Sequence, residues 1–570
     1  MGYKESYNEW LNNPYFDEDT KKELQGIAQD EKEIEERFYK ELEFGTGGLR
    51  GVIGAGTNRM NIYTVRKASQ GLANYIIKNN GEDKGVAIAY DCRFMSPEFA
   101  DVTACCMAAN GIKAYVFDAL RPTPELSFAL RELHCIAGVV VTASHNPPEY
   151  NGYKVYWEDG AQVSVPRDEE IIDEVNKVQI TEAKTMSLDE AKSKGLYNVI
   201  GEEIDDKYMA ELKKLIIHPE VITEMADDIK IVYSPFHGTG NVPVRRILKE
   251  LGFKNIYVVP EQELPDPKFT TLDYPNPEDP KAFTLALKLA KEKDADIVLA
   301  TDPDADRLGV YCKAPEGGYI SFTGNMSGML IADYIFHEKQ ATGTMPENPA
   351  LVSTIVTTDM TKAIAAEYGA RFIEVLTGFK YIGEQIKIFE ATGCNNYVFG
   401  LEESYGCLAG TYARDKDSIV AVMMLCEVAS FYKKQGKTLC DAMQDLYQKY
   451  GYYKEGLATL ELKGVDGAAE IQKKMENFRS NPPKMLGGFK VLAARDYKAD
   501  ERVDYASGEK TKTGLPSSNV LYYELEDNAW CCVRPSGTEP KIKFYFGVKG
   551  ESLADSDAKI AKLREDMLSI

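Results

Sequence analysis

The strongest constraint on the fold is an alternation of strands and helices that the sequence predicts three times in succession. Short apolar runs bounded by turn residues are typical of buried strands. Strands that alternate with helices form parallel sheets with helices on both faces. The sequence therefore predicts three successive doubly wound α/β domains of the βαβαβ type. We expect their strands at residues 85–90, 113–117 and 137–141, at 229–233, 255–259 and 295–300, and at 350–356, 371–375 and 396–399.

The segments outside these repeats differ in character. The first forty residues predict a helical arm, and residues 164–215 form a charged, helix-prone connection. Residues 520–526 and 529–533 predict an antiparallel hairpin, which a strand at 541–548 and an amphipathic helix follow. This last section is expected to form an α+β domain. We expect four domains around a central cleft, at residues 1–205, 206–322, 323–450 and 451–570.

The charge balance restricts the partners of the chain. Lys+Arg 67 against Asp+Glu 89 gives 67 − 89 = −22, a field that repels nucleic acid and anionic membrane. The eleven cysteines form no Cys-x-x-Cys pair, which favours reduced thiols. Neither a signal peptide nor an apolar segment of transmembrane length is apparent. We expect a cytoplasmic protein without nucleic-acid or membrane partners.

Each predicted repeat ends in a polar loop. The first has Thr142-Ala-Ser-His-Asn-Pro147, the second Asp302-Pro-Asp-Ala-Asp-Arg307, and the third Gly400-Leu-Glu-Glu-Ser-Tyr-Gly406. Ligands of open α/β sheets bind beyond the carboxyl ends of the strands. The three loops are therefore expected to face a shared crevice.

Ser144, in the first loop, has three interpretations. It can close a turn before Pro147, which is the usual role of a lone serine in such a place. It can be a hydrolase nucleophile, but Ala143 and His145 stand where the Gly-x-Ser-x-Gly elbow has glycines. It can also carry a phosphoryl group and transfer it. The loop alone does not choose between these roles.

The second loop predicts a metal site. Asp302, Asp304 and Asp306 alternate, so that in an extended loop their carboxylates can converge on one hard cation. An EF-hand is excluded, since Arg307 and Lys313 occupy the positions of its glycine and final glutamate. Three ligands leave positions open for a phosphate oxygen and water, which suits Mg²⁺. A solvated acidic turn is the alternative, although Arg307 is suited to handling phosphate.

Further residues suit the binding of a phosphorylated sugar. A guanidinium, two hydroxyls and a glycine in Arg534-Pro-Ser-Gly-Thr538 have the composition of an anion cradle. Glu402 and Ser404 can bind sugar hydroxyls, and Lys380 adds a positive charge in the same repeat. Arg50 follows a glycine-rich stretch and is a plausible phosphate contact.

In this order the motifs resemble those of the α-D-phosphohexomutases, the phosphoglucomutase/phosphomannomutase superfamily. The resemblance covers the whole chain, and the serine and aspartate loops are its most specific parts. The amino-terminal arm and residues 376–380 are most similar to the branch of larger phosphoglucomutases and phosphopentomutases. Gly47 departs from the many relatives that have serine there. The motifs are Gly45-Thr-Gly-Gly-Leu-Arg50, Thr142-Ala-Ser-His-Asn-Pro147, Asp302-Pro-Asp-Ala-Asp-Arg307, Glu402-Glu-Ser404 and Arg534-Pro-Ser-Gly-Thr538.

The resemblance implies a role for each motif. Ser144 would be phosphorylated, and with Asp302, Asp304 and Asp306 it would hold one Mg²⁺. His145, Lys154 and Arg50 would lie near the reacting group, with Lys154 a candidate general acid/base. The residues that would bind substrate are Arg307, Lys380, Glu402, Ser404, Arg534, Ser536, Gly537 and Thr538, the last four of which would hold the phosphate that is not transferred.

The resemblance also implies an activity. A phosphosugar mutase is expected, most simply one that interconverts glucose 1-phosphate and glucose 6-phosphate, with glucose 1,6-bisphosphate as intermediate and activator. Ribose phosphates, mannose phosphates or synthesis of a hexose bisphosphate are alternatives within the class. A Mg²⁺-dependent phosphatase and a non-catalytic sugar-phosphate sensor are alternatives outside it. The expected state is a monomer or a weak homodimer.

Overall fold

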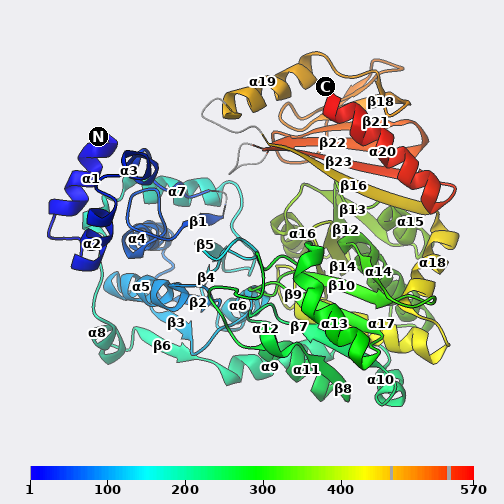
Figure 1. The fold of residues 1–570 in the computed structure, drawn as a ribbon, viewed down its shortest axis with the longest axis horizontal. Helices are drawn as coiled ribbons and strands as arrows, with labels where there is room; N and C mark the ends of the chain where they lie inside the picture. The colour runs from blue at the N-terminus through cyan, green and yellow to red at the C-terminus, as the bar shows by residue number, and fades with distance from the viewer. Residues whose placement is uncertain (1, 46, 462–466, 536–540, 570) are drawn as a thin grey trace. The chain divides into compact units, whose positions relative to one another are not determined.

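The computed structural model describes residues 2–45, 47–461, 467–535 and 541–569. They form two compact units that are interleaved along the chain. Figure 1 shows the helices and strands with their labels. Unit 1 comprises Met1–Gly324, Ile382–Gly393 and Ser404–Thr438. Unit 2 comprises Asn325–Tyr381, Cys394–Glu403 and Leu439–Ile570.

Unit 1 begins with the predicted helical arm, which the structure confirms. Its helices are α1 (Tyr3–Asn12), α2 (Glu18–Gly26) and α3 (Glu31–Phe38). An aromatic cluster joins them to the start of α4 (Ile62–Lys78), with Trp10 stacked on Phe16 at 4.1 Å and edge-on to Tyr63 at 5.6 Å. The arm is thus attached to the first domain by buried apolar area, the main stabilising contribution in folding.

The first sheet of unit 1 is mixed. Its three predicted strands are parallel, as expected, and are joined by a fourth parallel strand from the 164–215 connection. Two antiparallel strands extend the other edge, which the sequence had not predicted. The strand order is β1 (Gly48–Val52), β5 (Tyr150–Trp157), β4 (Ala137–Val141), β2 (Val86–Tyr90), β3 (Ala114–Phe117), β6 (Tyr197–Ile200).

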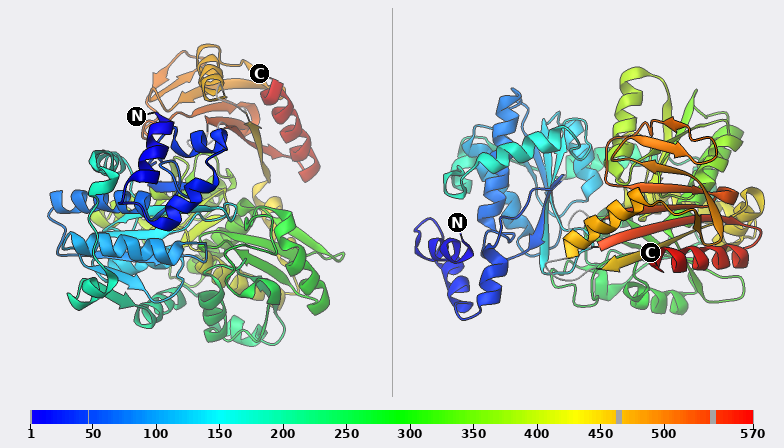
Figure 2. Two further views of the ribbon diagram at one scale, coloured as in Figure 1. Left: turned by 60° about the vertical axis from the view of Figure 1, so that its left-hand side comes forward. Right: turned by 90° about the horizontal axis from the view of Figure 1, so that it is seen from above.

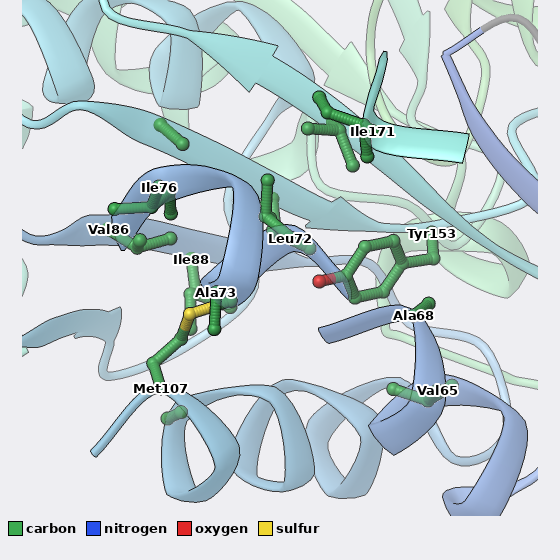
Figure 3. Packing of buried hydrophobic residues seen from close by; sticks show 14 of the residues in the cluster. Val65, Ala68, Leu72, Ala73, Ile76, Val86, Ile88, Met107, Tyr153 and Ile171 are labelled. Atoms are coloured by element: carbon green, nitrogen blue, oxygen red, sulfur yellow. The ribbon is translucent and has the colours of Figure 1, made fainter. Parts of the chain in front are cut away.

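Helices α4, α5 (Ser96–Ala109), α6 (Thr123–Glu132) and α7 (Arg167–Lys177) pack around this sheet. Figure 3 shows Ile76 and Ala73 of α4 beside Val86 of β2 and Met107 of α5. All four side chains are fully buried. Because β2 is covered on both faces, its sequence is a continuous apolar run, as parallel strands typically are.

The second sheet of unit 1 repeats this arrangement. Three parallel strands are again extended by two antiparallel strands at one edge. Along the chain, α11 (Asn241–Glu250) follows the first parallel strand and α13 (Thr284–Lys293) follows the second. The strand order is β11 (Tyr319–Phe322), β10 (Leu308–Lys313), β9 (Ile297–Thr301), β7 (Lys230–Ser234), β8 (Asn255–Val258).

Unit 2 contains the third repeat and the carboxyl-terminal sheet. Strands β12 (Pro349–Thr354), β13 (Arg371–Val375) and β14 (Asn396–Glu402) are parallel, as predicted. The carboxyl-terminal sheet is antiparallel, and the predicted hairpin is β21 (Leu521–Leu525) with β22 (Trp530–Pro535). The predicted final helix, α20 (Leu553–Ser569), lies along β16 (Tyr452–Glu461) and β23 (Lys541–Gly550), and is red in Figures 1 and 2.

The predicted fold class is therefore confirmed, as three α/β/α domains and an antiparallel carboxyl-terminal domain. Within the described residues, every helix is too short or too polar to cross a membrane.

The aromatic cluster of the arm generates a testable prediction. Trp10 is 2% exposed, so Trp10→Ala removes a buried ring and should lower the stability of the arm by about 3–5 kcal/mol. Hydrogen exchange should then show loss of protection in α1–α3. Tyr39→Ala is the matched control, because Tyr39 follows the arm and is 58% exposed. Equal protection in the two variants would contradict the stabilising role of the aromatic cluster.

Candidate active site

The serine loop begins where β4 ends, in the middle of the first sheet. Ser144 is 3% exposed, and its backbone N–H donates to Thr142 Oγ1 at 2.8 Å. Thr142 Oγ1 in turn donates to Asp91 at 2.6 Å. Ser144 has a left-handed backbone, with φ 52°, which costs a non-glycine residue about 1–2 kcal/mol. The surrounding hydrogen bonds hold it in this conformation.

The side chain of Ser144 connects the first and second sheets. Its Oγ donates to Asp302 Oδ2 at 2.8 Å and lies 3.1 Å from His145 Nδ1. The single hydroxyl hydrogen serves the aspartate, so the imidazole Nδ1–H is the donor to the serine oxygen. The structure thus places the serine loop against the aspartate loop.

The aspartate loop is the turn of the β9–β10 hairpin. Asp302, Asp304 and Asp306 are buried, and ligand oxygens from all three lie within 4.8 Å of one another. The backbone N–H groups of Asp306 and Arg307 donate to Asp302 Oδ1 at 3.1 and 3.0 Å, which bends the loop around the first carboxylate. The predicted convergence of the three carboxylates is therefore observed.

Two lysines stand against these carboxylates. Lys154 Nζ is 2.7 Å from Asp304 Oδ2 and 3.3 Å from Asp306 Oδ2. Lys416 Nζ is 2.8 Å from Asp306 Oδ2. Lys154 reaches the loop because β5 runs antiparallel to β4 and places it opposite Val140.

The burial and the charges separate the pKa values of these groups. Burial, together with the charges of Asp306 and Asp304, raises the pKa of Asp302 well above its usual range. Burial acts in the same direction on Asp306, but Lys416 and Lys154 outweigh it and lower the pKa. Burial opposes the charged form of Lys154, yet Asp304 and Asp306 raise its pKa overall, so this lysine is charged. Burial, with Arg307 and Arg50, lowers the pKa of His145 well below its usual value.

The three aspartates fit a hard divalent cation. In the described part of the chain, Asp304 Oδ1 and Asp306 Oδ1 are buried without a hydrogen-bond partner. An unpaired buried carboxylate oxygen is costly, and cation coordination removes that cost. Lys154 engages the Oδ2 atoms of the same residues, so the Oδ1 atoms remain available. An all-oxygen donor set suits Mg²⁺.

Two predicted arginines complete the site in unit 1. Arg50 lies on β1 opposite Gly152, and its guanidinium donates to Asn146 Oδ1 in the serine loop at 3.1 Å. A side chain at Gly152 would come within 2.4 Å of the Thr142 carbonyl oxygen, so glycine permits the close approach of β5. Arg307 donates to Glu278 at 2.9 Å, which holds it beside the aspartate loop.

The other predicted residues are distributed between the units. Lys380, Glu402 and Arg534 belong to unit 2, whereas Ser404 belongs to unit 1. Glu402 is the buried last residue of β14, and Arg534 lies on β22. Ser536, Gly537 and Thr538 lie outside the described residues.

Sequence reasoning missed Lys416 and Thr123. Thr123, at the start of α6, donates from Oγ1 to Asp304 Oδ2 at 2.8 Å. Lys416 precedes Asp417, the amino-terminal cap of α17 (Ser418–Lys434). The charged run Arg414-Asp-Lys-Asp417 before an apolar helix is the signal that was available. It indicates a helix cap, but the partner of Lys416 is 110 residues away in the chain.

The buried carboxylates predict a specific response to Mg²⁺. A ligand that binds only the folded state stabilises it, by about 2.7 kcal/mol at one hundred times its dissociation constant. Mg²⁺ should therefore raise the melting temperature of the wild type. Asp302→Asn keeps one oxygen as acceptor for the backbone N–H groups of Asp306 and Arg307, but it loses the second oxygen and the ligand charge. It should abolish the shift without lowering the stability of the metal-free protein, because one of three like charges is removed.

Asp294→Asn is the matched control, and differential scanning calorimetry with and without Mg²⁺ measures the melting temperatures of the wild type and both variants. Asp294 is an aspartate of the same domain with a side chain that is 68% exposed. It should retain the wild-type shift. A full shift in Asp302→Asn would show that the cation binds elsewhere.

Comparison with known proteins shows the family of the chain. Models of phosphoglucomutase/phosphomannomutase α/β/α domains I, II and III match residues 41–182, 206–317 and 323–450. A phosphoglucomutase of Staphylococcus aureus is 36% identical over 93% of this chain and 94% of its own length. One of Staphylococcus epidermidis is 37% identical over 95% and 96%.

Solved structures share the fold. A putative phosphomannomutase from Thermus thermophilus matches with a TM-score of 0.69 and 21% identity, over 93% of this chain and 99% of its own. The phosphoglucomutase pp63/parafusin from Paramecium matches with a TM-score of 0.69 and 19% identity, over 93% and 94%. The chain therefore belongs to the phosphoglucomutase/phosphomannomutase family of the α-D-phosphohexomutase superfamily.

Proposed function

We propose that the chain is a phosphoglucomutase that interconverts glucose 1-phosphate and glucose 6-phosphate. The curated relatives at 36–37% identity are phosphoglucomutases and match over nearly their whole length. The observation that carries the chemistry is the buried Ser144 hydroxyl, hydrogen-bonded to Asp302 in a loop of three aspartates. The chain is thus an enzyme, a phosphosugar mutase of carbohydrate metabolism.

The proposed reaction begins with a phosphoryl group on Ser144. A free hydroxyl of the sugar phosphate attacks the phosphorus, and the new P–O bond forms as the bond to Ser144 Oγ breaks. The sugar hydroxyl loses its proton as Ser144 Oγ gains one, so the step is balanced. The resulting glucose 1,6-bisphosphate then returns its other phosphoryl group to Ser144. The phosphoryl group that came from Ser144 thus remains on the sugar, while the original phosphate of the substrate moves to Ser144. The product therefore has its phosphate at the other position.

The charged and neutral groups near Ser144 suit proton transfer. Lys154 is charged, so it can donate a proton to the serine oxygen that leaves phosphorus. His145 is neutral and its Nδ1 contacts the same oxygen, so it orients that oxygen. Arg50, beside Asn146, adds positive charge toward the transferred group. We propose Ser144, His145, Lys154 and Arg50 as the catalytic residues.

The cofactors follow from the charge of phosphoserine. A phosphoserine has roughly −1.5 to −2 charge near neutral pH, and it would stand against three buried aspartates. We propose one Mg²⁺ held by Asp302, Asp304, Asp306 and an oxygen on Ser144. A cation bound there would supply positive charge to the phosphoryl oxygens. Glucose 1,6-bisphosphate would act as activator by restoring the phosphoryl group to an unmodified Ser144.

Further residues are proposed to bind the substrate. Arg307 and Lys380 offer positive charge, and Glu402 and Ser404 offer groups for sugar hydroxyls. The retained phosphate is assigned to Arg534, Ser536, Gly537 and Thr538. We further propose that the protein is cytoplasmic and works as a monomer or a weak homodimer.

Removal of the phosphoryl acceptor tests the mechanism. Ser144→Ala should lower the turnover of glucose 1-phosphate more than about 1,000-fold, since the covalent intermediate is lost. Intact-protein mass should show one phosphoryl group on the wild type and none on the variant. Ser193→Ala, on an exposed helical serine, should retain both activity and phosphorylation. A phosphatase that uses only the aspartates would release phosphate in Ser144→Ala.

The sugar specificity is tested with a substrate panel. The 1-phosphates of glucose, mannose, glucosamine and ribose are compared in the presence of Mg²⁺ and a trace of the matching bisphosphate. Glucose 1-phosphate should give the highest kcat/KM. Brisk turnover of ribose 1-phosphate without turnover of glucose 1-phosphate would instead assign a phosphopentomutase.

A further inference from the structure

A buried guanidinium lies directly beneath the serine loop. Arg93 stands between β2 and α5, and its side chain has no exposed surface. Its Nη2 donates to the carbonyl oxygens of Ser144 at 2.6 Å and Asn146 at 2.5 Å. Its Nη1 donates to those of Pro147 at 2.8 Å and Tyr150 at 3.0 Å. Four of the five N–H donors of Arg93 therefore bind the serine loop and the first residue of β5, and one of them binds the carbonyl of Ser144 itself.

Asp91 connects this guanidinium to the other side of the loop. Its Oδ2 is 3.3 Å from Arg93 Nε and accepts from Thr142 Oγ1. Thr142 Oγ1 also accepts the backbone N–H of Ser144. Both peptide groups that flank the Ser144 Cα are thus fixed, one through Asp91 and one through Arg93.

These hydrogen bonds stabilise the unusual backbone conformation of Ser144. Its φ of 52° lies in the left-handed region, which side-chain-bearing residues adopt only where the surroundings over-determine it. A serine released from these hydrogen bonds would relax toward negative φ and swing its Cα–Cβ bond. Oγ would then leave Asp302. Phosphoryl transfer depends on in-line positioning of the reacting atoms, so such a shift acts on the rate.

An aromatic ring from the second domain covers Arg93. The Arg93 guanidinium lies 5.1 Å from the centroid of the Phe269 ring, and Phe269 is fully buried. The segment that carries Phe269 is held at both ends by His237, whose ring nitrogens contact Leu264 O at 2.8 Å and Thr271 Oγ1 at 2.9 Å. Guanidinium faces cannot form hydrogen bonds but stack well on aromatic rings. Phe269 therefore restrains the guanidinium without competing for its donors.

We propose that Arg93 is a positioning residue for phosphoryl transfer at Ser144, and that Phe269 holds Arg93 in place from the second domain. The inference rests on the proposed mutase function, since it assigns these residues an effect on that reaction. Arg93 touches the backbone of the serine loop and acts through Ser144.

Arg93→Lys tests the geometry while keeping the charge. An ammonium has three donors on one atom and cannot span four carbonyls in a plane. We expect kcat with glucose 1-phosphate to fall about 100-fold, the effect of roughly 1 Å of misplacement, with KM within about 3-fold of the wild type. The ³¹P resonance of the phosphoserine should also shift or broaden, which a purely structural role would leave unchanged.

Phe269→Leu tests the covering ring. It keeps an apolar side chain but removes the π face, and kcat should fall about 10-fold, corresponding to the loss of one modest cation–π contact. Combined with Arg93→Lys it should add little, because both changes release the same group. Phe283→Leu is the matched control, a buried phenylalanine of the same domain, and should cost stability while leaving kcat unchanged.

The outcomes separate this inference from the proposed function. A wild type without mutase activity would refute the proposed function. An active wild type in which Arg93→Lys and Phe269→Leu keep the kcat of Phe283→Leu would refute the positioning role alone. A raised KM with unchanged kcat would do the same, since it would make Arg93 a binding residue. If circular dichroism shows that Arg93→Lys does not fold, the kcat of Phe269→Leu against Phe283→Leu decides.

Discussion

The burial of three carboxylates at the end of β9 is the constraint on which the rest of unit 1 depends. Like charges at such short range are costly unless cations and donors surround them. The groups that do so come from separate elements: Lys154 from β5, Thr123 from the start of α6, and Lys416 from the segment before α17. The electrostatics of one loop thus specify how the first and second domains pack.

The sequence was sufficient for features that are local in the chain. The apolar run before Ser144 and the one before Asp302 each predicted a strand that ends in a functional loop, and both strands are observed. The convergence of the three aspartates followed from their alternation alone. The antiparallel strands β5 and β10 were not predicted, although each pairs with the strand directly before it, because the connecting loops 142–149 and 302–307 are longer than the two-residue turns that signal a hairpin. Strand β6 was taken for part of a charged connection, because its partner β3 lies far away in the chain.

The two lysines show where local reasoning ends. Lys154 was assigned to the site only through the resemblance to a family, since a lysine within an apolar strand has no pattern of its own. Lys416 was missed altogether. Both are explained once the carboxylates are known to be buried, because a buried negative charge requires a cation within a few ångströms. The need for a nearby cation is evident from the structure but not from the spacing of residues in the sequence. It therefore explains the positions of residues that periodicity does not predict.

Several non-glycine residues with left-handed backbone lie in the same part of unit 1. Ser144, Ala305, Phe236, His237 and Phe269 all have φ between 43° and 63°, and none is glycine. Each belongs to the serine loop, to the aspartate loop or to segments that pack against them. Such conformations conflict with local preference, and they persist where many buried hydrogen bonds fix the backbone. A site that moves a phosphoryl group between two oxygens gains from this rigidity, because its catalysis is chiefly positioning and electrostatics. The residues that local rules predict worst are therefore those that the chemistry holds most tightly.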